Sequence, residues 1–172
     1  MKHSLRLLAA LACAASVTAN AGDVFERKPG LWKITTQLAG KSAPHLAEQC
    51  LATDTDARIA RSGLATMKGL CSQFESHRDG ANFVTDSICK IGNHVSHGHT
   101  VTTPDGDGAY HVVVKTHYDN PPPSLPADSV FTQEGRWAGP CPGGMKPGDQ
   151  ITQVGPQLPG GLKTNLLDTL GK

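Results

Sequence analysis

Short β-prone segments separated by turn sequences fill the chain from Gly30 to Ala138, and they constrain the fold more than any other feature. Asp79-Gly80 and Gly92-Asn93 tolerate the positive φ angles of tight hairpin turns. Strands that recur about every ten residues with tight turns are typical of an antiparallel meander. We expect strands at residues 31–38, 46–51, 70–77, 81–90, 95–103, 110–118 and 130–138.

One helix interrupts this pattern. Residues 53–56 are rich in helix-capping types, and apolar residues follow at helical spacing up to Met67. Gly63 weakens the second half, where a turn is the alternative. A meander buries one face and needs a cover. We therefore predict a mainly β fold, an antiparallel meander that forms a curved sheet or incomplete barrel around one short helix. A two-sheet β-sandwich is the alternative.

The first residues resemble an export signal. Lys2 and Arg6 precede a short apolar run over residues 5–17, and Ala19-Asn20-Ala21 has the small-x-small pattern that signal peptidase cleaves. We expect a signal peptide at 1–21, cleaved after Ala21. A single disulfide-braced β-domain is then expected at 22–141, followed by a Gly/Pro-rich, extended C-terminal tail at 142–172.

Cys13, inside this leader, suggests lipoprotein processing as a competing interpretation. Lipoproteins are cleaved just before a lipidated cysteine. Here, however, the position three residues earlier is Ala10 instead of the usual Leu, and the apolar run ahead of Cys13 is short. We therefore prefer removal of Cys13 with the leader.

The remaining cysteines are Cys50, Cys71, Cys89 and Cys141. In an exported chain, an even number of cysteines predicts disulfides. Of the three pairings that four cysteines allow, we prefer Cys50–Cys71, which would bracket the helix, and Cys89–Cys141. A zinc site is disfavoured because the chain contains no Cys-x-x-Cys pair.

The charge balance excludes some partners. The formal net charge is +1, and loss of the leader's two cations leaves the chain close to neutral. Such a chain has no electrostatic footprint for nucleic acid or for an anionic membrane surface. No apolar run after the leader approaches the ~20 residues of a transmembrane helix. We expect neither nucleic acid as a partner nor a transmembrane segment.

Histidines and tryptophans are the candidate functional side chains. His94, His97 and His99, with His111 or His117 from a neighbouring strand, could gather as ligands for Zn²⁺ or Cu²⁺. No carboxylate in the sequence has the spacing to orient them, so we favour surface histidines and assign no metal. Trp32 and Trp137 are favoured as core anchors, with a ligand pocket as the alternative. We assign no catalytic residue, because the chain has no Gly-x-Ser-x-Gly elbow and no expected free thiol, and we assign no cofactor.

Several motifs resemble one known family. They are Lys28-Pro29-Gly30-Leu31-Trp32-Lys33-Ile34-Thr35-Thr36, Gln49-Cys50-Leu51, Gly106-Asp107-Gly108-Ala109-Tyr110, Gly135-Arg136-Trp137-Ala138-Gly139-Pro140-Cys141 and Met145-Lys146-Pro147-Gly148-Asp149. In this order they are similar to domain of unknown function 3617, a family of exported bacterial proteins, chiefly from Gram-negative species. The resemblance covers roughly residues 25–150. It implies an exported, disulfide-bearing small domain with no established activity, substrate or cofactor, and no catalytic residues to carry over.

These observations favour a non-catalytic protein over an enzyme. We expect a periplasmic binding or envelope-associated β-domain, with a small apolar ligand or an envelope protein as its partner. The alternative is a metal-handling protein that uses His94, His97 and His99. A hydrolase of unknown substrate is the second alternative.

Overall fold

The computed structural model describes residues 25–40, 43–123, 125–153 and 160–170. The expected signal peptide, its cleavage site and Cys13 lie outside these residues. The strands are β1 (Gly30–Leu38), β2 (His45–Leu51), β3 (Cys71–Asp79), β4 (Asn82–Ile91), β5 (His94–Asp105), β6 (Ala109–Tyr118), β7 (Asp128–Gly139), β8 (Asp149–Thr152) and β9 (Leu162–Asn165). The helices are α1 (Thr55–Leu70) and α2 (Leu166–Leu170).

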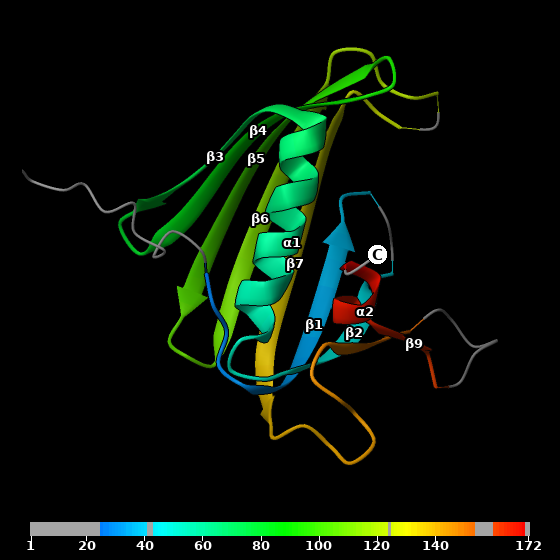
Figure 1. Cartoon of the computed structure of the whole chain (residues 1–172). Coiled ribbons are helices and arrows are strands. Elements are labelled where there is room, and N and C mark those ends of the chain that lie inside the picture. The colour runs from blue at the N-terminus through cyan, green and yellow to red at the C-terminus, as the bar shows by residue number, and fades with distance from the viewer. Residues whose placement is uncertain (1–24, 41–42, 124, 154–159, 171–172) are drawn as a thin grey trace, which may run out of the picture.

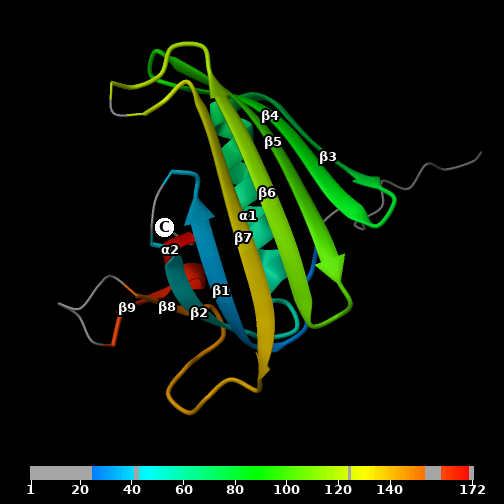
Figure 2. The ribbon, with the colours of Figure 1, turned by 180° about the vertical axis from the view of Figure 1, so that it is seen from behind.

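These nine strands form one antiparallel sheet in the order β3-β4-β5-β6-β7-β1-β2-β8-β9, which is not closed into a barrel. The sheet curves around α1, which lies along its concave face (Figure 1). The same helix lies behind β6 and β7 when the molecule is viewed from the convex side (Figure 2). The predicted curved sheet around a helix is thus confirmed. The β-sandwich alternative is wrong, because a helix covers the sheet where a sandwich would have a second sheet.

The expected strands correspond to β1–β7, with ends that differ by a few residues. Gly80 and Gly92 have φ angles of +60° and +61° at the hairpin turns that the sequence predicted. Helix α1 differs from expectation because it continues through Gly63 to Leu70. Good helix formers on both sides of Gly63, among them Ala60 and Ala65, offset the roughly 1 kcal/mol that a helical glycine costs.

The segment after Cys141 also differs from the expected extended tail. β8 pairs with β2, and β9 pairs with β8, so this segment adds two strands to the sheet. Gly148, at φ +89°, turns the chain into β8, and its carbonyl accepts a hydrogen bond from the Leu166 backbone N–H (2.9 Å). These four-residue strands lack a clear sequence pattern because their stability comes from pairing with neighbouring strands, β8 with β2 and β9 with β8.

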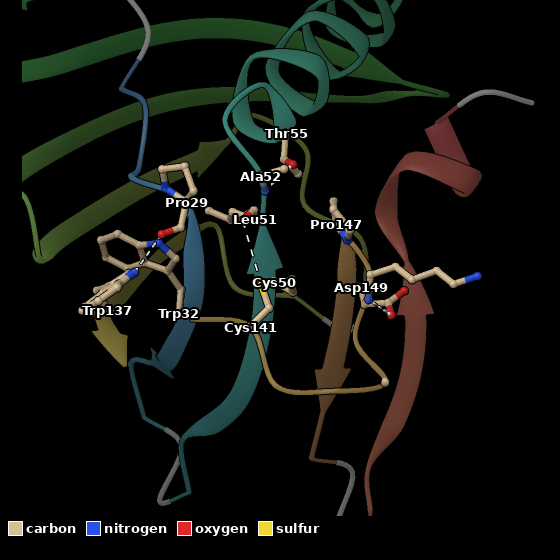
Figure 3. Close-up of a disulfide and its surroundings, with 12 residues drawn as sticks. Pro29, Trp32, Cys50, Leu51, Ala52, Thr55, Trp137, Cys141, Pro147 and Asp149 are labelled. Atoms are coloured by element: carbon tan, nitrogen blue, oxygen red, sulfur yellow. Dashed lines mark hydrogen bonds between the residues drawn. A yellow bond between two sulfur atoms is a disulfide. The ribbon is translucent and has the colours of Figure 1, made fainter. Parts of the chain in front are cut away.

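The disulfide pairing differs from the preferred one. The bonds are Cys50–Cys141 and Cys71–Cys89, not Cys50–Cys71 and Cys89–Cys141. β2 and β7 both pair with β1, which brings the end of β2 close to the segment that follows β7. Figure 3 shows the Cys50–Cys141 bond at this junction. The second bond joins the directly paired strands β3 and β4, whose register places Cys71 opposite Cys89.

The buried core is small and lies near the first turn of α1. It consists of Trp32, Ile34, Leu51 and Tyr110, with Phe25, Ala47 and Val112 packed against it. Gly135 on β7 allows the Tyr110 ring to lie flat on the sheet, because a Cβ at Gly135 would be 2.0 Å from that ring. The well-packed part of the molecule is therefore confined to one end of the helix.

Asp149, at the start of β8, gives the structure a dependence on pH. Its carboxylate accepts hydrogen bonds from the Lys146 backbone N–H (2.7 Å) and from Asn165 (2.8 Å), and Lys163 Nζ lies 2.8 Å away. The Lys146 N–H, followed by Lys163 and Asn165, lowers the pKa of Asp149 from 3.8 to about 2. The native state therefore gains stability above the unfolded-state pKa and loses it as the pH falls toward about 2.

We expect Asp149→Asn to lower the free energy of unfolding by roughly 1–2 kcal/mol at neutral pH, because the amide cannot replace the charged acceptor. Denaturant unfolding at several pH values measures this difference. The difference in the free energy of unfolding between wild type and variant should decrease as the pH falls from about 4 to about 2. A gap that stays constant down to pH 2 would contradict this assignment.

Candidate functional site

A cavity of about 780 Å³ lies between α1 and the concave face of the sheet. We call it the helix–sheet cavity. Most of its lining residues on α1 are apolar or small, and its floor is formed by side chains from eight strands, β1 to β8. The residues that face it are Phe25, Glu26, Arg27, Ile34, Gln49, Asp56, Ala57, Ile59, Ala60, Arg61, Gly63, Leu64, Met67, Phe74, Ser76, Phe83, Thr85, Thr102, Tyr110, Val112, Gln133 and Gln150.

The cavity exists because α1 does not pack closely on the sheet. Among the described residues of α1, only Thr55 and Asp56 in the first turn are buried. Ile59, Leu64 and Met67 point into the cavity from further along the helix, and Leu64 remains 38% exposed. A surface helix of a globular protein ordinarily buries its apolar stripe in the core. Here that stripe borders open space instead.

The floor below the helix is divided into two chemically different sides. Phe74 and Phe83 come from β3 and β4 at one side of the sheet. Gln49 and Gln150 come from β2 and β8 at the other side, where they are register partners. The cavity is therefore aromatic on the side formed by β3 and β4, and it carries carboxamides on the side formed by β2 and β8.

The N-terminal end of α1 is fixed by an ion pair between Arg27 and Asp56. The Arg27 backbone N–H, Nε and Nη2 all donate to the Asp56 carboxylate, at 2.8, 2.9 and 2.6 Å. Burial by itself lowers the pKa of Arg27, but the hydrogen bond and charge of Asp56 outweigh it, and the pKa is raised above its ordinary value. Arg27 therefore stays charged, and its charge lies directly against the Asp56 carboxylate.

A row of hydrogen bonds crosses the floor from this ion pair. Arg27 Nη1 lies 3.5 Å from the Tyr110 hydroxyl, which donates to Gln133 Oε1 (3.2 Å), and Gln133 Nε2 donates to Thr36 Oγ1 (3.3 Å). Burial raises the pKa of Tyr110, although the nearby Arg27 opposes this effect. The Tyr110 hydroxyl therefore remains a protonated donor, and the row carries no net charge beyond the neutralised pair.

The C-terminal end of α1 is fixed by a covalent bond. Cys71 follows the last helical residue, adopts an extended conformation and is joined to Cys89 on β4. Helix α2 packs beside α1 near the β1–β2 side of the sheet (Figure 1). Both ends of the helix are thus attached to the sheet, while its middle spans the cavity.

The histidines that the sequence singled out lie away from this cavity. The β5–β6 register places His97 opposite His117, which comes from the neighbouring strand. Each contacts a carboxylate: His97 Nε2 lies 3.1 Å from Asp119, His99 Nδ1 lies 2.7 Å from Asp86 and His117 Nδ1 lies 2.8 Å from Asp128. His94 Nδ1 lies 2.6 Å from the Asn120 carbonyl oxygen.

The expectation that no carboxylate could orient these histidines is wrong, because the sheet supplies Asp86 and Asp128 from adjacent strands. A depression of about 570 Å³ lies beside His97, His99 and His117. Within the described ranges, however, no three His, Cys, Asp or Glu side chains are placed to hold a metal ion together. Nor does any described histidine hydrogen-bond to a serine, threonine or cysteine.

The two tryptophans have different environments, and neither faces the helix–sheet cavity. Trp32 is buried and donates from Nε1 to the Lys28 carbonyl (2.9 Å). Trp137 is 38% exposed, donates to the Pro29 carbonyl and lies against Gly30, with Lys28 Nζ 4.2 Å from the centre of its ring (Figure 3). The core assignment therefore suits Trp32 and not Trp137.

Sequence reasoning missed the residues that do form the cavity. Phe74, Phe83 and Gln49 lie within the predicted strands, and Ile59 and Met67 within the predicted helix. Helical spacing identified Ile59 and Met67 as members of an apolar helix pattern, and the other three were assigned only to strands. Those patterns do not reveal the separation between the two faces.

None of the described helices is long and apolar enough to cross a membrane. Comparison with protein families matches residues 27–141, more than half of the 172-residue chain, to a family model described as "Protein of unknown function (DUF3617)". No curated protein and no solved structure matches the chain.

Proposed function

The chain belongs to the DUF3617 family, whose description names no activity, and from the geometry of the helix–sheet cavity we propose that this protein binds a small molecule with an apolar chain. The observation that carries the proposal is the unpacked apolar side of α1. Ile59, Leu64 and Met67 border open space above Phe74 and Phe83. An apolar ligand between them would complete the core that the protein alone leaves open.

The size of the cavity supports a small molecule over a protein segment. Small-molecule sites are concave, mostly apolar and roughly 300–1,000 Å³ in volume. The helix–sheet cavity, at about 780 Å³, falls in that range. The attachments at the two ends of α1, Arg27–Asp56 and Cys71–Cys89, favour a preformed site over one that must fold around its ligand.

We further infer that the protein works in the periplasm, as a binding or envelope-associated domain. Two disulfides fit a protein outside the reducing cytoplasm. The leader over residues 1–21 supports export. Mass spectrometry of the protein from its native host tests this: a mature chain that starts at Gly22 and lacks four hydrogen atoms relative to the fully reduced form is expected. Recovery of an uncleaved, fully reduced chain would contradict it.

Dye binding tests the ligand proposal. We expect the disulfide-bonded protein to bind the uncharged dye N-phenylnaphthylamine saturably, with one site per chain and increased fluorescence. Ala60→Phe should weaken this binding at least about tenfold, because Ala60 faces the cavity and the ring would fill part of it. Fluorescence titration gives the dissociation constants, and circular dichroism checks that the variant is folded.

Ala65→Phe is the matched control, because Ala65 is an exposed residue on the same helix that does not line the cavity. Its dye affinity should stay within about twofold of wild type. Absence of saturable dye binding by the wild type would exclude the proposed function. If both substitutions weakened dye binding equally, the dye would not be bound in the cavity, and the assigned site would be wrong.

A further inference from the structure

One polar side chain in the cavity has no partner within the protein. Gln49 is 3% exposed, and its side chain makes no hydrogen bond with any residue that the structure describes. Its carboxamide atoms are still accessible, because no completely enclosed side-chain nitrogen or oxygen in the described residues lacks a partner. Since Gln49 lines the helix–sheet cavity, that accessible space is the cavity.

Unpaired polar groups at such depth are uncommon in folded proteins. Nearly all buried polar side chains have a hydrogen-bond partner, and an unsatisfied one lowers stability. An apolar residue would fit this position without that penalty, between Trp32 on β1 and Gln150 on β8, which are its register partners. The unpaired carboxamide of Gln49 therefore indicates a hydrogen-bond partner from outside the chain.

The charges around the cavity restrict the chemistry of that partner. Arg27 and Asp56 neutralise each other. The other charged residues that line the cavity, Glu26 and Arg61, are exposed and opposite in sign. An ionised group beside Gln49 would therefore be buried without a counter-ion, which is strongly unfavourable. A carboxamide, by contrast, both donates and accepts hydrogen bonds, so it complements an uncharged group that does the same.

We propose that Gln49 is the polar anchor of the site and selects an uncharged amphiphile, with an amide or hydroxyl group at Gln49 and Gln150 and an apolar chain extending toward Phe74 and Phe83. This inference rests on the proposed function and adds the class of ligand. Gln150 already donates to Thr152 Oγ1 through Nε2 (3.1 Å), which leaves its Oε1 free to accept from the same ligand group.

Displacement of N-phenylnaphthylamine by three ligands of equal chain length tests the inference. Decanamide, decanoate and decyltrimethylammonium are compared below their micellar concentrations. We expect decanamide to displace the dye at about tenfold lower concentration than either ion. Gln49→Met keeps the length of the side chain and removes its hydrogen bonding. It should raise the inhibition constant of decanamide, calculated with the variant's own dye affinity, about five- to tenfold.

Gln73→Met is the control, because Gln73 is an exposed residue of β3 that does not line this cavity. Equal displacement by decanoate would overturn the inference. Unchanged displacement by decanamide in the folded Gln49→Met variant would also overturn it, because the Gln49 carboxamide would then hydrogen-bond to water and not to the ligand. If the dye binds but the three ligands displace it equally, the role of Gln49 as polar anchor is refuted and the proposed ligand cavity is not. Absence of dye binding refutes the proposed function and, with it, this inference.

Discussion

Loss of the Cys50–Cys141 disulfide, through Cys50→Ala with Cys141→Ala, is expected to lower the free energy of unfolding by about 4 kcal/mol. The bond closes a loop across 91 residues of sequence, and in the chain-entropy estimate a longer loop restrains the unfolded chain more strongly. Cys50 is also 1% exposed, so its replacement disturbs packing next to Leu51. Denaturant unfolding under oxidising conditions measures the change.

The Cys71→Ala, Cys89→Ala variant provides the comparison within the same protein. Its bond spans 18 residues, so its removal should cost about 3 kcal/mol, less than removal of the longer loop. Because this bond holds the C-terminal end of α1, its loss should also weaken dye binding. A larger loss of stability from the short loop than from the long one would contradict the expected order.

Disruption of the Arg27–Asp56 pair is expected to have an effect of similar size. Arg27→Met removes the two side-chain donors, Nε and Nη2, from a carboxylate whose side chain is 10% exposed, and leaves only the backbone N–H. It should lower the free energy of unfolding by about 3–5 kcal/mol. The main cause is the unpaired charge that remains at Asp56 under the first turn of α1. Equilibrium unfolding in urea, with near-ultraviolet circular dichroism to follow tertiary packing, measures it.

Lys33 and Glu48 form a matched control pair on β1 and β2. Their charged atoms lie 3.7 Å apart, but the side chains are 63% and 38% exposed, so Lys33→Met should change stability by less than about 1 kcal/mol. Combining Arg27→Met with Asp56→Leu should cost less than the sum of the single changes, because no buried charge is left unpaired. Strict additivity, or equal costs for Arg27→Met and Lys33→Met, would show that the pair is not coupled.

The strands, their order along the chain and the turn glycines were predictable because they follow from local patterns. The disulfide pairing depended on tertiary structure, although part of it could have been excluded. A helix between Cys50 and Cys71 rises about 1.5 Å per residue. The 16 residues of α1 therefore separate its ends by far more than the roughly 7 Å that a disulfide allows between Cα atoms. The possible break at Gly63 concealed this conflict.

The candidate site was less accessible to sequence reasoning. Gln49 lies in a predicted strand, but nothing in the sequence pattern indicated that its carboxamide would lack a partner. The carboxylates beside His99 and His117 were missed because they come from other strands, and cross-strand register decides such contacts. The distance between α1 and the sheet is set by attachments at residues 27 and 71, which no local pattern in the helix encodes.

The open edges of the sheet bear on how the site responds to ligands of different shape. β3 and β9 stand at the two ends of the strand order and do not pair with each other. In a closed barrel, the number of strands and their stagger fix the circumference, and with it the width of the interior. A sheet with two free margins has no such fixed perimeter. The girth of the proposed ligand would therefore be limited by the helix above the sheet and not by a closed ring of hydrogen bonds.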